Sequence, residues 1–189
     1  MSDIDSSTPQ IGVRGDGDLP ACVTVLRAVH LSDGYPVNWP DDPARWLGGG
    51  ADEPSWVAHR GGRVVGHVTL TRPGAGDVAP TLVASGTGVA VVGRLFVDPS
   101  ARGHRIGTLL IETAVREARL RGARAVLDVA ATDRAAVALY ERLGWEFLGT
   151  RQQEWQPGQL VDVRCYAAPA PGGGPEHTAS SQPTVKESP

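Results

Sequence analysis

The stretch that decides the fold runs from a strand into a helix and reads Val89-Ala90-Val91-Val92-Gly93-Arg94-Leu95-Phe96-Val97-Asp98-Pro99-Ser100-Ala101-Arg102-Gly103-His104-Arg105-Ile106-Gly107-Thr108. The segment from Gly88 to Val97 is a near-continuous apolar run, as expected of a buried central strand. Free N–H groups at the start of the next helix, together with the helix dipole, favour anions. Arg102, His104 and Arg105 add positive charge there. The turn therefore predicts a phosphate or pyrophosphate site.

Regular elements are expected on both sides of this turn. Apolar residues recur at helical spacing from Ile106 to Leu120, and Asp133 is placed to cap a helix that ends near Gly144. Helical spacing also covers Asp16 to Val29, and a short helix is expected over Asp41 to Leu47. Further strands are expected at 55–59, 64–71, 125–129, 145–150 and 160–166. This order predicts a mixed α/β sheet with helices on its faces.

Composition bounds the class of protein. The 189 residues include 24 Gly and 15 Pro, and the net charge is −3, which argues against a general nucleic-acid-binding protein. No apolar run is long enough to span a bilayer, and the first ten residues do not resemble a signal peptide, so we expect no membrane association and a cytoplasmic location. Cys22 and Cys165 are expected as buried, unpaired side chains. We expect disordered tails at 1–10 and 168–189 around one domain at 11–167.

Other phosphate-binding motifs do not fit the turn. A nucleotide P-loop requires Gly-Lys-Ser/Thr, which is absent from the sequence. A dinucleotide fold requires G-x-G-x-x-G, and Gly103 with Gly107 has the wrong spacing. The histidines outside the turn lack metal-ligand spacing, so no metal site is expected.

Two segments together resemble the GNAT superfamily of N-acetyltransferases. The family's acyl-CoA signature, Arg/Gln-x-x-Gly-x-Gly/Ala, stands here as Arg102 to Gly107, with Arg105 in place of the first glycine. The second signature, A-x-x-L-Y-x-x-x-G-F/W, matches Ala136 to Trp145, and Asp133 precedes it where the family often has Asn. The resemblance implies a GNAT-like mixed, mostly antiparallel sheet flanked by helices on both faces. It also implies acetyl-CoA as the co-substrate.

The resemblance also implies roles for individual residues. Tyr140 would donate a proton to the leaving CoA thiolate, although a purely packing role for its ring is the alternative. A backbone N–H near Leu95 would stabilise the oxyanion. Asp133 would contact the cofactor or simply cap its helix. The backbone groups implied for the pantetheine arm are those of Leu95, Phe96 and Val97, and those for the pyrophosphate are Arg102, Gly103, His104, Arg105, Ile106, Gly107 and Thr108.

The acceptor side is expected in the segment from Asp33 to Trp46, which combines aromatic and acidic residues suited to a cationic amine. The early helical region commonly borders the acceptor site in GNAT folds. The candidate acceptor-binding residues are Asp33, Tyr35, Trp39 and Trp46, and the alternative is that the aromatics only seal the sheet. The strand from Gly88 to Val97 carries no carboxylate, so the general base stays open. Deprotonation would need a water chain or a carboxylate from elsewhere, and the candidates are Asp33, Asp41, Asp42, Asp52 and Glu53.

The resemblance thus implies transfer of an acetyl group from acetyl-CoA to a primary amine of a small molecule, by direct attack on the thioester. Two other functions stay open. One is a protein N-terminal or lysine acetyltransferase, and the other is a non-catalytic acyl-CoA-binding sensor, suggested by the missing strand carboxylate. The sequence is compatible with a monomer or a homodimer and does not identify the acceptor.

Overall fold

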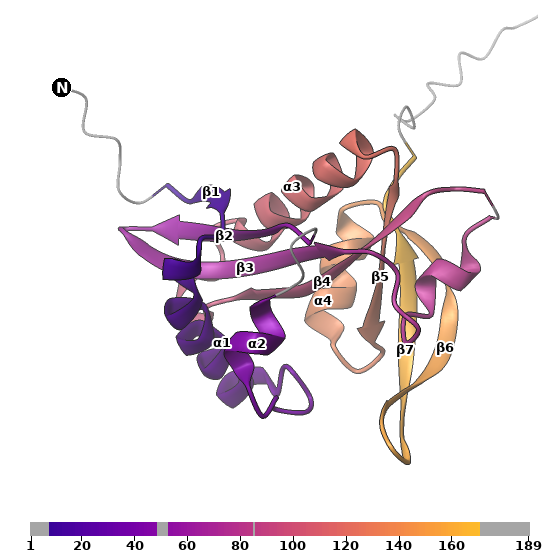
Figure 1. Ribbon diagram of the computed structural model, residues 1–189, viewed down its shortest axis with the longest axis horizontal. Coiled ribbons are helices and arrows are strands. Elements are labelled where there is room, and N and C mark those ends of the chain that lie inside the picture. The colour runs from indigo at the N-terminus through magenta and orange to yellow at the C-terminus, as the bar shows by residue number, and fades with distance from the viewer. Residues whose placement is uncertain (1–7, 49–52, 85, 171–189) are drawn as a thin grey trace, which may run out of the picture.

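The computed structural model describes residues 8–48, 53–84 and 86–170, which form a seven-stranded sheet in the order β1-β2-β3-β4-β5-β7-β6 (Figure 1). Most of the two predicted tails lies outside the described residues. The strands are β1 (Gln10–Val13), β2 (Ser55–Arg60), β3 (Arg63–Thr71), β4 (Val89–Val97), β5 (Arg124–Ala130), β6 (Glu146–Gln156) and β7 (Gln159–Ala167). The helices are α1 (Leu19–Asp33), α2 (Pro43–Gly48), α3 (Ile106–Leu120) and α4 (Arg134–Arg142), with short 3-10 turns at Asp16–Asp18, Ala79–Leu82 and Pro99–Ala101.

The pairing of β4 with β5 is the one parallel pairing among the described strands. It joins only Val89, Ala90 and Val91 to residues 124–126. β4 then runs on to Val97 and β5 to Ala130 without pairing to each other, so the two strands diverge. The mixed, mostly antiparallel sheet expected from the sequence is confirmed, and its central strands leave an opening.

Both faces of the sheet are covered, with α3 on one side and α1 with α2 on the other (Figure 1). Alternating side chains of the strands serve the two faces, as the period of a strand requires. Ala90 and Val92 pack in the same cluster as Leu110 of α3, whereas Val91 packs under the Ala79–Leu82 turn. Cys22 and Cys165 are both buried and unpaired, as expected.

Two elements differ from the sequence-based expectation. Strand β1 occupies Gln10–Val13, part of which was assigned to a disordered tail, because it pairs antiparallel with the edge of β2. The hairpin of β6 and β7 is longer than predicted, since β6 continues to Gln156. The residues from Arg151 to Gln156 are mostly polar, so their pairing with β7 has no hydrophobic signature in the sequence.

A bulge in β4 is held by a buried histidine. Arg94 has a backbone φ of 50°, in the left-handed region that a side chain rarely adopts. Its carbonyl accepts a hydrogen bond of 2.9 Å from Nδ1 of His67, a fully buried side chain of β3 that stacks on Phe96. Because a carbonyl only accepts, Nδ1 carries the proton, and Nε2 accepts from the Arg14 guanidinium 3.3 Å away. Burial lowers the pKa of His67 to about 4.

The neutral state of His67 predicts a loss of stability in acid. As the pH falls from 7 toward 4, the unfolded chain takes up a proton at this histidine well before the folded chain does, so unfolding becomes easier. We expect this to contribute on the order of 3 kcal/mol to the fall in the free energy of unfolding. His67→Asn keeps a donor for the Arg94 carbonyl and is expected to lack this contribution in urea titrations at several pH values. The exposed control His104→Asn is expected to follow the wild type, and identical pH slopes for all three proteins would contradict the assignment.

Candidate functional site

A cavity of about 1310 Å³ lies where β4 and β5 diverge. Its walls come mainly from four parts of the fold: the end of α1 with the segment after it, the second half of β4 with the following turn, the end of β5, and α4. Trp46 of α2 and Trp155 of β6 complete the lining. These parts are distant in the sequence and are brought together because the β4–β5 pairing stops at Val91. The cavity therefore occupies the place that the continued ladder would have filled.

The turn between β4 and α3 forms one end of the cavity. Gly103 and Arg105 have φ values of 85° and 60°, so the chain reverses here in left-handed conformations before α3 begins. Arg105 stands at the N-cap of α3 without a side-chain cap hydrogen bond, which leaves the first N–H groups of the helix available to a ligand. Of the residues predicted to bind the cofactor, His104 does not line the cavity. The others do: Leu95, Phe96, Val97, Arg102, Gly103, Arg105, Ile106, Gly107, Thr108 and Asp133.

The α4 side of the cavity carries Tyr140. Asp133 caps α4, because its carboxylate accepts a hydrogen bond of 3.0 Å from the Ala136 N–H. The Tyr140 ring packs between Trp145 and Tyr166, with centroid distances of 5.5 and 5.9 Å, yet the residue also lines the cavity. Burial raises the pKa of Tyr140 above its usual value, so the hydroxyl stays protonated. The packing and ligand-facing interpretations of this ring are thus compatible.

The predicted acceptor residues separate into two groups. Asp33, Tyr35 and Trp46 line the cavity. Trp39 does not, and instead packs against His30 with ring centroids 5.1 Å apart. Asp33 forms an ion pair with Arg102, which lies in the turn between β4 and α3. This hydrogen-bonded partner lowers the pKa of the Asp33 carboxyl.

The carboxylate that the sequence reasoning missed is Asp128 of β5, which lines the cavity. It accepts hydrogen bonds from the N–H groups of Val78 at 3.0 Å and Ala79 at 2.8 Å, so it also fixes the Ala79–Leu82 turn. Burial is the main cause that raises its pKa, and Cys165 donates a further side-chain hydrogen bond. A single acid inside the apolar run Ala125 to Val129 is the signal that could have found it.

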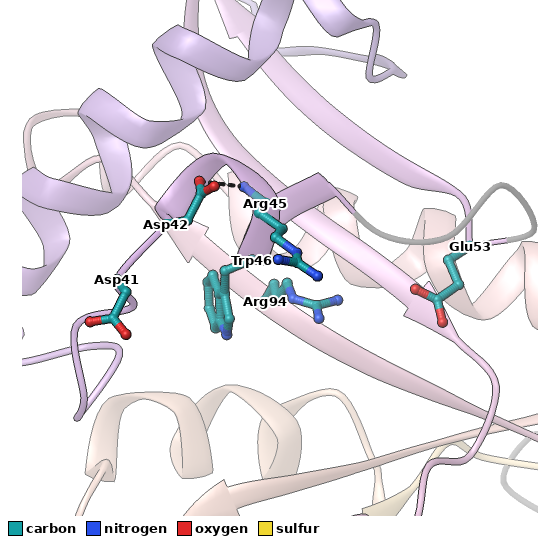
Figure 2. Close-up of a pocket in the computed structure, with 6 residues that line it drawn as sticks. All are labelled: Asp41, Asp42, Arg45, Trp46, Glu53 and Arg94. Atoms are coloured by element: carbon teal, nitrogen blue, oxygen red, sulfur yellow. Dashed lines mark hydrogen bonds between the residues drawn. The ribbon is translucent and has the colours of Figure 1, made fainter.

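Of the candidate bases named from the sequence that the structure describes, Asp33 lines the cavity and the others do not. Asp41, Asp42 and Glu53 line a second pocket, of about 580 Å³, together with Arg45, Trp46 and Arg94 (Figure 2). Trp46 and Arg94 line both pockets, so the pockets adjoin. Asp52 falls outside the described residues. No group of three or more potential metal-ligating side chains occurs in the described segments, and none of their helices is long and apolar enough to cross a membrane.

Solved structures share this fold. The ribosomal-protein-S18-alanine N-acetyltransferase from Escherichia coli superposes with a TM-score of 0.64 at 21% identity, covering 89% of this chain and 98% of that chain. The ribosomal-protein-alanine N-acetyltransferase from Brucella melitensis gives 0.63 at 25% identity, covering 84% and 98%. Arabidopsis thaliana NAA60, solved in complex with acetyl-CoA, gives 0.66 at 19% identity, covering 85% and 97%.

Sequence comparison agrees with the fold. An uncharacterised N-acetyltransferase of Methanocaldococcus jannaschii is 46% identical over 59 residues, which are 31% of this chain and 26% of that protein. The match thus spans about a quarter of the relative's length. The family model described as acetyltransferase (GNAT) family matches residues 26–145, which include both signatures and most of the cavity wall. The chain therefore belongs to the GNAT family of acetyl-CoA-dependent acetyltransferases.

Proposed function

We propose that this protein transfers the acetyl group of acetyl-CoA to a primary amine of a small molecule. The observation that carries the proposal is that the β4–α3 turn, Tyr140 and Asp128 line one continuous cavity. A non-catalytic acyl-CoA sensor would not need a half-buried acid and a protonated tyrosine facing the same space. The missing carboxylate on β4, which suggested such a sensor, is replaced by one on the neighbouring strand β5.

The donor occupies the end of the cavity formed by the β4–α3 turn. The N–H groups at the start of α3 hold the pyrophosphate, and Arg102 and Arg105 add positive charge around it. Beyond Val91, β4 is unpaired on its β5 side, so the backbone near Leu95 is available to the pantetheine arm and to the thioester oxygen. The arm thus takes a place resembling that of the missing strand partner.

The chemical step needs one proton acceptor and one proton donor. The amine nitrogen attacks the thioester carbonyl carbon, and Asp128 takes the proton that the nitrogen loses. Collapse of the tetrahedral intermediate breaks the carbon–sulfur bond, and Tyr140 donates its proton to the leaving thiolate. A carboxyl with a raised pKa is a better base than an ordinary one. The two backbone N–H groups and Cys165 use three of the four lone pairs of Asp128, which leaves one for the proton.

The acceptor enters beside the segment after α1. The Asn38 side chain there donates a hydrogen bond of 2.7 Å to the Gln159 side chain at the β6–β7 turn. This bond joins two distant segments, and Asn38 lines the cavity. A bridge of this kind favours an amine at the end of a slender molecule over a lysine within a folded protein surface.

The role of Tyr140 is tested by Tyr140→Phe. Removal of the acid is expected to lower kcat by about 10²-fold, since general acid catalysis contributes on that order, while the Kd for acetyl-CoA measured by calorimetry stays unchanged. The matched control is Tyr166→Phe, the same change in an adjacent buried ring whose hydroxyl bonds Glu141 at 3.1 Å. Unchanged turnover in Tyr140→Phe would leave this ring a packing role only. Failure of the wild type to bind acetyl-CoA at millimolar concentration would sink the proposed function.

The role of Asp128 is tested by Asp128→Asn. Asparagine keeps an oxygen for one of the two backbone N–H groups but cannot take a proton. We expect kcat/KM to fall by about 10²-fold or more, with loss of the acidic limb of the pH–rate profile. Asp162→Asn, an exposed acid on the adjacent strand β7, serves as the control. An unaltered pH profile in a folded Asp128→Asn protein would show that the base lies elsewhere.

A further inference from the structure

The pocket that adjoins the cavity contains two arginines that the proposed chemistry does not use. Arg45 of α2 and Arg94 of β4 both line it, and in Figure 2 their guanidinium groups extend toward the same end of the pocket. Within the described part of the chain, neither guanidinium forms an ion pair. Paired guanidinium groups present planar sets of N–H donors that match a carboxylate.

The Arg94 side chain is held in place from both ends. Its backbone is fixed in the left-handed region by the His67 hydrogen bond. Its guanidinium lies over the Trp46 ring, 5.3 Å from the ring centroid. A non-glycine residue at positive φ is strained, and such outliers gather at ligand sites. Preorganisation of this kind reduces the entropy lost when the side chain binds a ligand.

Arg94 is also electrostatically connected to the reacting centre. Its positive charge lowers the pKa of Tyr35, although burial of that ring is the larger effect and raises it. Arg94, Tyr35 and Tyr140 all line the main cavity. A ligand group on Arg94 therefore adjoins the same cavity as the proposed catalytic tyrosine.

The three acids that line the pocket are distributed unevenly around the two arginines. Asp42 is engaged by its own helix, because it accepts a hydrogen bond of 2.9 Å from the Arg45 N–H. Asp41 lies on the other side of the Trp46 ring from the guanidinium groups (Figure 2). Glu53 lies at the end toward which both guanidinium groups point, so two cations face one acid there.

We propose that Arg94 and Arg45 form a subsite for a carboxylate of the acceptor, so that the substrate is an amino acid or a related compound with a carboxylate remote from the reacting amine. This proposal rests on the proposed acetyl transfer and specifies its acceptor. The amine reaches Asp128 in the main cavity, and the carboxylate lies against the arginines at the mouth. An amine without a carboxylate would lose these charge-assisted hydrogen bonds.

The test uses two series of probes: unbranched ω-amino acids of increasing length, and the corresponding ω-amino amides. We expect kcat/KM to peak at one chain length among the acids and to exceed that of the matching amide by about 10- to 100-fold, as expected for hydrogen bonds to a charged group. In Arg94→Gln and in Arg45→Gln the acid-to-amide ratio is expected to fall toward one. Comparing ratios between proteins cancels the difference in amine basicity between the two series.

Arg27→Gln is the matched control, because Arg27 also stacks on a tryptophan, Trp39 at 5.7 Å, but lines neither pocket. Its acid-to-amide ratio is expected to equal that of the wild type. Calorimetry of the same probes in the presence of CoA measures binding without turnover. Binding of the acids that depends on Arg94 but is never followed by acetylation would overturn the proposed function and keep the subsite. Acetylation without preference for the acids, or no binding of any acid, would overturn the subsite.

Discussion

The short parallel pairing between β4 and β5 is the constraint on which the rest of the site depends. The ladder joins only three residues of β4, up to Val91, and then the strands diverge. A longer ladder would give more backbone N–H and C=O groups a hydrogen-bond partner, but it would close the cavity. Divergence exposes the second half of β4 on one side and Asp128 of β5 on the other, so backbone donors and a carboxylate face the same space. The helix after β4, α3, adds its N-terminus to the wall, and the helix after β5, α4, adds the side chain of Tyr140.

A second constraint fixes the elements around the bulge at Arg94 relative to one another. His67 donates to the Arg94 carbonyl and accepts from Arg14, and the same guanidinium donates to the carbonyls of Leu47 and Gly48 at the end of α2. One buried histidine thus connects β3, β4, the end of β1 and α2, the helix that carries Arg45 and Trp46. Its neutrality matters because a charged imidazole would lie buried beside the Arg14 cation.

The sequence predicted those parts of the site that depend on local structure. The turn from Arg102 to Thr108, the cap at Asp133 and the apolar central strand each have a signature within a few residues, and the structure has all three. Asp128 and the bulge at Arg94 were missed because their roles arise from contacts between distant strands. Trp39 was predicted at the acceptor site from the composition of its segment. Its ring packs against His30 and does not line the cavity. Composition does not determine toward which side of a loop a ring points.

The proposed roles of the charged side chains give a physical reason for an acceptor that carries both signs. Among the charged residues that line the cavity, Arg102 and Arg105 belong to the turn proposed for the pyrophosphate, Asp128 is the proposed base, and Arg94 is the proposed carboxylate partner. A molecule with an amine and a remote carboxylate matches Asp128 and Arg94. An acceptor with a cation at its far end is disfavoured, since Arg94 would repel it. A protein with a net charge of −3 thus carries arginines at both proposed anion sites and a half-buried acid at the proposed reacting centre.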